Sequence, residues 1–262
     1  MPALFAVSDI HGHRAEFHDV LRDTGLIDAA GDWSGADARL WLLGDYFDRG
    51  PDGIGVIDDI RRLTGQAAAA GGEVGALLGN HEVQLLAAKR FGAATIPGWE
   101  SRTDGYYGAW LAYGGQDRDL EGLTADHVAW LGSLPALAVV DDHLLMHCDS
   151  TRYLDFGDDL DAVNAVVAEE MTGTDPGEWL YFVSRLSGRG ELSSPAAVDA
   201  LLGAFGGSVI VHGHSTLISQ FGYTRETVRE PHRYSDDRVL AIDGGVFEGG
   251  RLLVAELGTV RG

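Results

Sequence analysis

Short apolar runs alternate with helical patterns through the first third of the chain. Three runs each end abruptly in polar residues, as buried strands that lead into loops do: residues 3–7, 39–43 and 74–78. Residues 14–24 repeat apolar side chains at helical spacing. A second helical pattern follows Pro51, which suits the first position of a helix. Strand, helix, strand, helix, strand is the order of parallel βαβ units.

The rest of the chain is less regular. Residues 138–146 predict a hairpin that turns at Asp141 and Asp142, and residues 152–205 predict mostly helix. Further strands are expected at residues 208–211, 238–242 and 250–257. Residues 91–135 hold six Trp and Tyr side chains among glycines and acids, and we interpret them as an irregular, partly helical insertion that caps one side of a site.

Polar side chains able to bind metal follow five of the predicted strands. They are Asp9, His11, Asp45, Asp48, Asn80, His81, His147 and His214. Loops at the carboxyl ends of parallel strands gather at one edge of a sheet, so we expect these side chains to converge. Carboxylate, imidazole and amide ligands suit a divalent or trivalent ion such as Mn, Fe or Zn. Two ions that share one carboxylate need roughly this number of ligands.

Each cluster has a simpler explanation when it is taken alone. Asn80 could be a helix N-cap, His147 a hydrogen-bonded core histidine, and Asp45 and Asp48 loop acids paired with Arg49. The ordered set, with each member at the end of a separate apolar strand, favours the metal site over these explanations.

The length and composition of the chain indicate its domain organisation and the classes of partner that it is expected to lack. The 262 residues fit one large α/β domain, and the net charge of −21 argues against nucleic acid as a partner. The single cysteine, Cys148, excludes an internal disulfide and suits a reducing compartment. The N-terminus lacks a signal-peptide pattern, and no apolar run approaches the roughly 20 residues of a membrane span. We therefore expect a cytoplasmic protein with no membrane partner.

The motifs resemble, in order, those of calcineurin-like metallophosphoesterases. The matching stretches are Asp9-x-His11-Gly12, Gly44-Asp45-x-x-Asp48-Arg49-Gly50, Gly79-Asn80-His81-Glu82, His147 and Gly213-His214-Ser215. The arginine of the second motif and the glutamate of the third are similar to the PPP-type serine/threonine protein phosphatases, in a bacterial form. The resemblance runs from residue 3 to about 250 and leaves out the insertion at residues 91–135.

The resemblance implies a fold that the periodicity supports only in its first half. It implies an α/β fold, a four-layer α/β/β/α sandwich in which two mixed sheets pack face to face between helices. The whole chain, residues 1–262, would be a single domain of this type.

The resemblance also implies a ligand set for two metal ions, with manganese the first expectation. Asp9 and His11 would hold one ion, and Asp45 would bridge both. The second ion would take Asn80, His147 and His214 as its remaining ligands. A hydroxide bridging the two ions would attack phosphorus in line with the ester oxygen.

Three further residues take catalytic roles by the same resemblance. Arg49 would bind the transferring phosphoryl group. His81 would protonate the leaving oxygen, and Asp48 would hydrogen-bond to His81 and fix its tautomer. A second phosphate-binding arginine is expected between the fourth and fifth motifs, with Arg185 as the first candidate and Arg189 as the second.

Some positions depart from the family pattern. The PPP branch has His-Gly-Gly where this chain has His147-Cys148-Asp149, which we interpret as a bacterial-type variant. A nucleophilic Cys148 is disfavoured, because cysteine phosphatases need an arginine six residues later and Leu154 stands there. His212 is expected to support the site or contact substrate without binding metal. Residues 243–247 are interpreted as structural.

Two enzyme functions and one non-enzyme function follow. The first is hydrolysis of phosphoserine or phosphothreonine in proteins, or of a small phosphate ester. The second, on the same core, is hydrolysis of dinucleoside polyphosphates such as diadenosine tetraphosphate, with adenines stacked on the aromatic residues of the insertion. We favour a hydrophobic cluster as the explanation of those aromatics. A catalytically dead binding scaffold is disfavoured, because every ligand position is filled.

Overall fold

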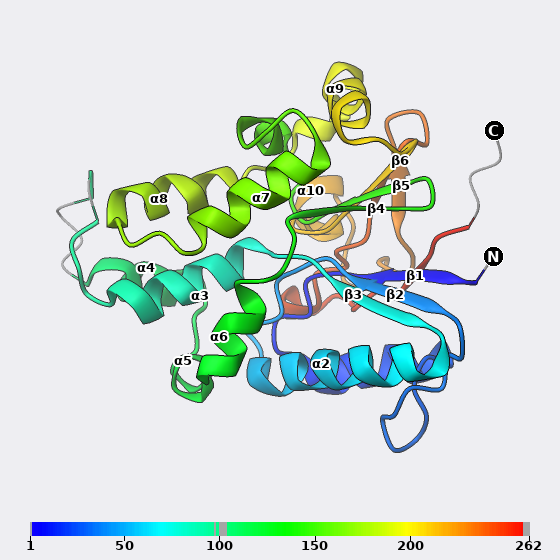
Figure 1. Ribbon diagram of the computed structural model, residues 1–262. Coiled ribbons are helices and arrows are strands. Elements are labelled where there is room, and N and C mark those ends of the chain that lie inside the picture. Colours follow the sequence, from blue (N-terminus) through cyan, green and yellow to red (C-terminus); the bar gives the residue numbers. More distant parts are fainter. Residues whose placement is uncertain (1, 97, 100–103, 259–262) are drawn as a thin grey trace.

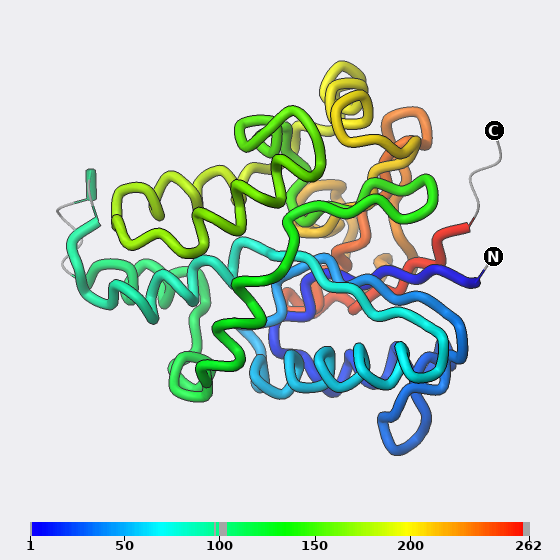
Figure 2. The backbone as a smooth tube through the Cα atoms, in the orientation of Figure 1, coloured from blue at the N-terminus to red at the C-terminus, as the bar shows by residue number. Residues whose placement is uncertain are grey.

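Two β-sheets lie next to each other at the centre of the molecule, with helices outside them (Figure 1). The computed structural model describes residues 2–96, 98, 99 and 104–258. The first and last described residues both lie on the right-hand side of the molecule in the view of Figure 2. The figure also shows the opposite ends of the first strands running into loops that face the insertion.

The first sheet has the strand order β3-β2-β1-β9. Strands β1 (Leu4–Val7), β2 (Arg39–Leu42) and β3 (Glu73–Ala76) are parallel, and β9 (Ala255–Glu256) joins β1 in the antiparallel sense. The three parallel strands are those that the apolar runs predict. The last run, at residues 250–257, forms a strand only over its final part.

The second sheet has the order β4-β5-β6-β8-β7. Its strands are β4 (Leu137–Val140), β5 (His143–Met146), β6 (Val209–His212), β7 (His232–Tyr234) and β8 (Val239–Ala241). The predicted hairpin is confirmed as β4 and β5, while β5, β6 and β8 are parallel. Strand β7 was not predicted, because its short, polar sequence carries no apolar signal.

Successive side chains of a strand point to opposite faces of its sheet, and their contacts show that the two sheets pack face to face. In β1, Leu4 and Ala6 join a cluster that also holds Val209 and Val211 of β6, so these side chains fill the space between the sheets. The alternate residues, Phe5 and Val7, face the larger cluster beneath the helices, which contains Val7 and against which Phe5 packs. The four-layer α/β/β/α arrangement of two mixed sheets is therefore confirmed.

Helices cover the outer face of each sheet. Helices α1 (Arg14–Asp23) and α2 (Gly53–Ala70) lie on the first sheet. The predicted start of α2 at Pro51 is wrong. The helix begins at Gly53, because the side chain of Asp52 accepts a hydrogen bond from the Gly55 N–H (2.9 Å) and caps it.

The long stretch between β5 and β6 is helical, as expected. It comprises α7 (Leu160–Glu170), α8 (Pro176–Arg185) and α9 (Pro195–Phe205), with short 3₁₀ turns at Thr151–Asp155 and Glu191–Ser193. Helix α7 packs on β4 and α9 on β6, at the outer face of the second sheet. The short α10 (Leu217–Phe221) follows β6, and a last 3₁₀ turn covers Val246–Glu248.

The insertion is more helical than predicted. After α3 (Asn80–Phe91) the chain forms α4 (Gly105–Ala112), α5 (Asp117–Gly122) and α6 (Ala125–Leu131), while residues 97 and 100–103 lie outside the described residues. Helix α4 lies along α3, where the Phe91 and Tyr106 rings are 5.1 Å apart (Figure 1). Over the described ranges, no helix is both long and apolar enough to cross a membrane.

A buried carboxylate ties α1 to α2. Asp59 of α2 accepts hydrogen bonds from Arg14 Nε (2.6 Å) and His18 Nε2 (2.6 Å) of α1. Arg62 Nη2, one turn away on α2, adds a third donor at 3.0 Å. Because all the donors meet one buried acceptor, Asp59 fixes how the two helices lie on the first sheet.

Replacing Asp59 with Asn should therefore lower the free energy of unfolding by about 1–3 kcal/mol near neutral pH, since the donors lose a charged acceptor. Burial alone would raise the pKa of Asp59, but the hydrogen bonds from Arg14, Arg62 and His18 outweigh it and lower the pKa below 3.8. The stabilisation is thus present above the unfolded-state pKa and is lost as the pH falls through the folded-state pKa.

Urea unfolding of the wild type and of Asp59→Asn at neutral and acidic pH measures this effect. The difference between the two proteins should shrink in acid. Asp19→Asn is the matched control, because Asp19 pairs with Arg22 on the exposed surface of α1 and its loss should change little. A difference for Asp59→Asn that is independent of pH would contradict the assignment.

Candidate functional site

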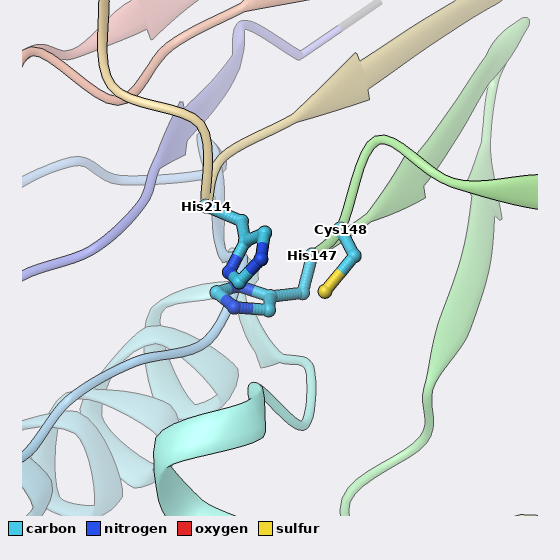
Figure 3. A group of neighbouring side chains, drawn as sticks. All are labelled: His147, Cys148 and His214. Carbon is cyan, nitrogen blue, oxygen red and sulfur yellow. The ribbon is translucent and has the colours of Figure 1, made fainter. Parts of the chain in front are cut away.

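The predicted ligands converge at the loops that follow β1, β2, β3, β5 and β6. Ligand atoms of Asp9, Asp45 and His147 lie within 4.8 Å of one another, and so do those of His11, Asp45 and His81. Asp45 belongs to both groups, as a bridging carboxylate would. The rings of His147 and His214 lie against each other, with centroids 5.0 Å apart, at the ends of β5 and β6 (Figure 3).

The backbone of these loops is strained. Asp9, His11, Asp45 and His214 all have positive φ, between 46° and 66°, in the left-handed region that side chains other than glycine rarely adopt. Gly213 lies so close to the first loop that a Cβ there would collide with Ser8 and Asp9. Such strain persists only where surrounding contacts enforce it, and it brings successive side chains to one point.

Backbone carbonyls orient two of the imidazole rings. His11 Nδ1 donates to the Phe47 carbonyl and His147 Nδ1 to the Leu43 carbonyl, each at 2.8 Å. In both rings Nε2 is therefore aimed at Asp45, at 3.7 Å from Oδ2 for His11 and 3.3 Å from Oδ1 for His147. This is the carbonyl–imidazole arrangement that fixes the tautomer of metal-binding histidines.

The chemistry of the donor atoms fits a pair of metal ions. Within the described part of the chain, His214 Nε2 is buried and has no hydrogen-bond partner. Burial and the nearby charge of His147 hold the pKa of His214 well below its usual value, so its lone pair is available. His147 Nε2 lies 2.9 Å from Asn80 Oδ1, and the carboxylates of Asp45 and Asp9 outweigh burial and raise the pKa of His147 to about 10. The negative charge around His147 therefore favours binding of a cation at this position.

A second group of charged residues lies beside the ligands. His81 Nδ1 hydrogen-bonds to Asp48 Oδ2 at 2.7 Å, and the Arg49 guanidinium reaches His81 Nε2 at 3.2 Å and His11 Nε2 at 3.0 Å. Burial would lower the pKa of His81, but Asp45 and Asp48 outweigh it and raise the pKa. The geometry thus brings the predicted Asp48, Arg49 and His81 together next to Asp45.

Glu82 holds the loops together, a role that the sequence interpretation missed. Its buried carboxylate accepts hydrogen bonds from the backbone N–H groups of Asp45 (2.9 Å), Tyr46 (2.8 Å) and Gly79 (2.9 Å). Burial and the Asp45 charge raise the pKa of Glu82 to about 7. A glutamate three residues after the N-cap glycine is a capping signal that would have identified part of this role.

The segment interpreted as structural, residues 243–247, also reaches the site. Asp243 is buried, Oδ2 has no partner among the described residues, and burial together with the charge of Asp9 raises its pKa well above the usual value. The Phe247 ring lies 3.8 Å from the Arg49 guanidinium carbon and packs edge-on against His11. An acid after strand β8 is the same signal that marked the other strand ends.

Cys148 and His212 are satisfied by packing and hydrogen bonds. Cys148 Sγ donates to the Leu186 carbonyl at 2.6 Å, and burial holds the pKa of the thiol well above its usual value, which argues against a thiolate nucleophile. Figure 3 shows its sulfur beside the two histidine rings. Both nitrogens of His212 are hydrogen-bonded, to the Gly213 carbonyl and to the Tyr234 hydroxyl. His212 therefore supports the loop after β6.

A cavity of about 600 Å³ opens over the site. Arg49, Asn80, His81 and His214 are among the residues that line it. The remaining walls are largely apolar and come from the insertion and α8: Ile96, Trp99, Tyr106, Ala109, Trp110, Tyr113, Leu180 and Val183. Four of the six Trp and Tyr residues of the insertion thus line a ligand-sized space, in addition to the hydrophobic cluster that the insertion forms.

The two candidate arginines point to different places. Arg189 lines the cavity together with His81 and His214. Arg185 is 6% exposed, pairs with Glu170, lies over the Phe156 ring (3.9 Å) and lines a separate space between α7 and α8. These contacts do not bring Arg185 to the site and favour Arg189 as the second phosphate-binding arginine.

Asp149 holds the loop that carries Arg189. Its carboxylate accepts hydrogen bonds from Ser215 Oγ (2.6 Å), beside the predicted ligand His214, and from the Gly190 N–H (2.7 Å). This acid, one of the departures from the family pattern, therefore fixes the loop that carries Arg189.

Curated proteins with similar sequences match only part of this chain. Shewanella-like protein phosphatase 2 of Arabidopsis thaliana is 31% identical over 83 residues, 32% of this chain and 21% of that protein. A symmetrical bis(5'-nucleosyl)-tetraphosphatase of Aromatoleum aromaticum is 31% identical over 145 residues, 55% of this chain and 43% of that protein. The chain thus spans less than half the length of either relative.

A solved structure, the cold-active protein-tyrosine phosphatase of a psychrophile Shewanella species, shares the fold. It has a TM-score of 0.70 at 23% identity and covers 98% of this chain and 76% of its own. Residues 3–216 match the family described as calcineurin-like phosphoesterases. That range includes every loop from which the converging ligands come, and the chain belongs to the calcineurin-like phosphoesterase family.

Proposed function

We propose that the chain is a metal-dependent hydrolase of phosphomonoesters, with phosphoserine or phosphothreonine in proteins as its substrate. The observation that carries the proposal is the joint placement of a shared carboxylate, Asp45, and the Asp48–His81–Arg49 group, of which His81 and Arg49 line the cavity. Family membership and the phosphatase relatives support the reaction class.

The residues that would hold two metal ions are those that converge on Asp45. Asp9, His11 and Asp45 would bind one ion, and Asn80, His147 and His214 would complete the other, with Asp45 shared. When bound, the ions supply an activated water and neutralise charge on the phosphoryl group. The mixed oxygen and nitrogen donors favour manganese, iron or zinc, and we propose manganese.

Residues of the chain itself then bind the substrate and donate one proton to the leaving group. Arg49 and Arg189 bind the phosphoryl oxygens as the bond between phosphorus and the ester oxygen breaks and water's oxygen bonds to phosphorus. His81 Nε2 gives its proton to the leaving oxygen, which departs as an alcohol. Asp48 Oδ2 accepts a hydrogen bond from His81 Nδ1 and holds the ring, so that Nε2 faces the ester.

Dinucleoside polyphosphate hydrolysis is the second candidate. Trp99, Tyr106, Trp110 and Tyr113 all line the cavity, and aromatic faces stack on nucleobases. The match to the Aromatoleum tetraphosphatase points the same way. A catalytically dead scaffold has less support, because all the proposed ligands are present and converge. Absence of both bound metal and p-nitrophenyl phosphate hydrolysis in added manganese would revive it.

Two carboxylate variants should separate metal binding from proton transfer. Asp45→Asn should lose metal and activity together, because the carboxylate shared by both ligand groups is gone. Asp48→Asn should keep both metals and lower kcat by about a hundredfold or more, since His81 loses the charge that holds its tautomer. Metal analysis of each protein with kinetics on p-nitrophenyl phosphate is the measurement. Full activity of Asp48→Asn would remove His81 as the acid.

Arginine variants should test the reassignment of the second phosphate ligand. Arg189→Ala should lower kcat/KM by about tenfold to hundredfold, because a charged hydrogen-bond donor to the phosphoryl group is lost. Arg185→Ala is the matched control and should lower Tm while leaving kcat/KM near the wild-type value, since Glu170 loses its partner. The reverse pattern would restore Arg185.

Substrate choice can be measured on the purified, manganese-loaded protein. A phosphoseryl or phosphothreonyl peptide should turn over faster than diadenosine tetraphosphate. A phosphotyrosyl peptide forms a third arm, because the structurally similar Shewanella enzyme is named a protein-tyrosine phosphatase. Turnover of the dinucleotide alone would overturn the protein-phosphatase proposal, and turnover of the phosphotyrosyl peptide alone would overturn its serine/threonine specificity.

A further inference from the structure

The insertion contacts the catalytic turn directly. We propose that Trp110 of α4 is a positioning residue of the reaction, whose indole N–H fixes the Asp48 carboxylate and thereby the orientation of His81. This inference rests on the proposed function, in which His81 protonates the leaving oxygen. It assigns a purpose to the insertion, which lies outside the motifs that identify the family.

The hydrogen bonds form a short chain. Trp110 Nε1 donates to Asp48 Oδ1 at 2.8 Å, and Asp48 Oδ2 accepts from His81 Nδ1 at 2.7 Å. One carboxylate therefore receives the indole on one oxygen and the imidazole on the other. Trp110 is 1% exposed and Asp48 is fully buried, so this hydrogen bond lies away from bulk solvent.

The same insertion holds the backbone of this turn. Asp119 Oδ2 of α5 accepts from the Asp48 N–H at 3.1 Å, and the Gly114 carbonyl accepts from the Arg49 N–H at 2.8 Å. Asp48 and Arg49 have φ values of 68° and 63°, in the left-handed region. A strained turn persists only where its surroundings enforce it, and here residues 110–119 supply the contacts.

Trp110 of α4 connects the cavity wall to the Asp48–His81 pair. Trp110 lines the cavity and also holds Asp48. Loss of the indole N–H would leave one carboxylate oxygen without its donor and free the carboxylate to rotate. His81 would then lose its fixed orientation, while the ligand set around Asp45 would keep its own contacts with Glu82 and His147.

The predicted effect depends on the leaving group. Trp110→Phe should lower kcat for phenyl phosphate by about tenfold to hundredfold, because phenoxide is a poor leaving group that needs the proton from His81. The loss for p-nitrophenyl phosphate should be clearly smaller, because its leaving group departs without full protonation. KM and metal content should stay near the wild-type values.

A double-mutant cycle tests whether Trp110 acts through Asp48. In an Asp48→Asn background, Trp110→Phe should cause little further loss, since the carboxylate on which it acts is already gone. Trp130→Phe is the matched control: it removes an indole from α6 of the same insertion, where the ring packs near Tyr46. It should change neither the kcat ratio of the two substrates nor KM.

If Trp110→Phe fails to fold, benzothienylalanine at position 110 keeps the ring shape and removes only the N–H donor. An equal loss on both substrates, or losses that add fully in the double mutant, would overturn the proposal. A wild-type protein that hydrolyses neither substrate would instead overturn the proposed function, so the two failures are distinguishable.

Discussion

The buried carboxylate of Glu82 is the constraint on which the rest of the site depends. It accepts backbone N–H groups from the loop after β2 and from the loop after β3, and so joins two strand ends that are far apart in sequence. Asp45 is thereby fixed at the meeting point of the other ligands. The same contacts satisfy N–H groups that a strained, buried loop would otherwise leave without partners.

The loops around Asp45 have a strained backbone and are covered by the insertion. Positive φ angles at Asp9, His11, Asp45 and His214 direct side chains from separate strands to one point. Burial lowers the pKa of His214, while the carboxylates of Asp45 and Asp9 raise the pKa of His147. The insertion adds a second layer, because it walls the cavity and contacts the turn at Asp48. The strand-end loops thus carry the converging side chains, while α4 and α5 hold the turn at Asp48 and α4 lines the cavity.

Sequence reasoning succeeded where the signal is local. The apolar runs before Asp9, Asp45 and Asn80 predict strands that the structure confirms, because a buried parallel strand needs a continuous apolar segment. It failed at strand β7, whose polar residues form a strand only by pairing with β8. It ranked Arg185 before Arg189, because the sequence shows that an arginine lies on a helix but not which side of that helix faces the cavity.

The sequence by itself determined the strands, the ligand types and their order, since the spacing of apolar residues and the chemistry of Asp, His and Asn are properties of the chain. Only the tertiary structure decided which arginine reaches the cavity, that Glu82 joins two loops, and that Trp110 contacts Asp48. The contacts of Glu82 with Tyr46 and of Trp110 with Asp48 connect residues that lie 36 and 62 positions apart. Their distance depends on how the layers pack, and no local pattern encodes it.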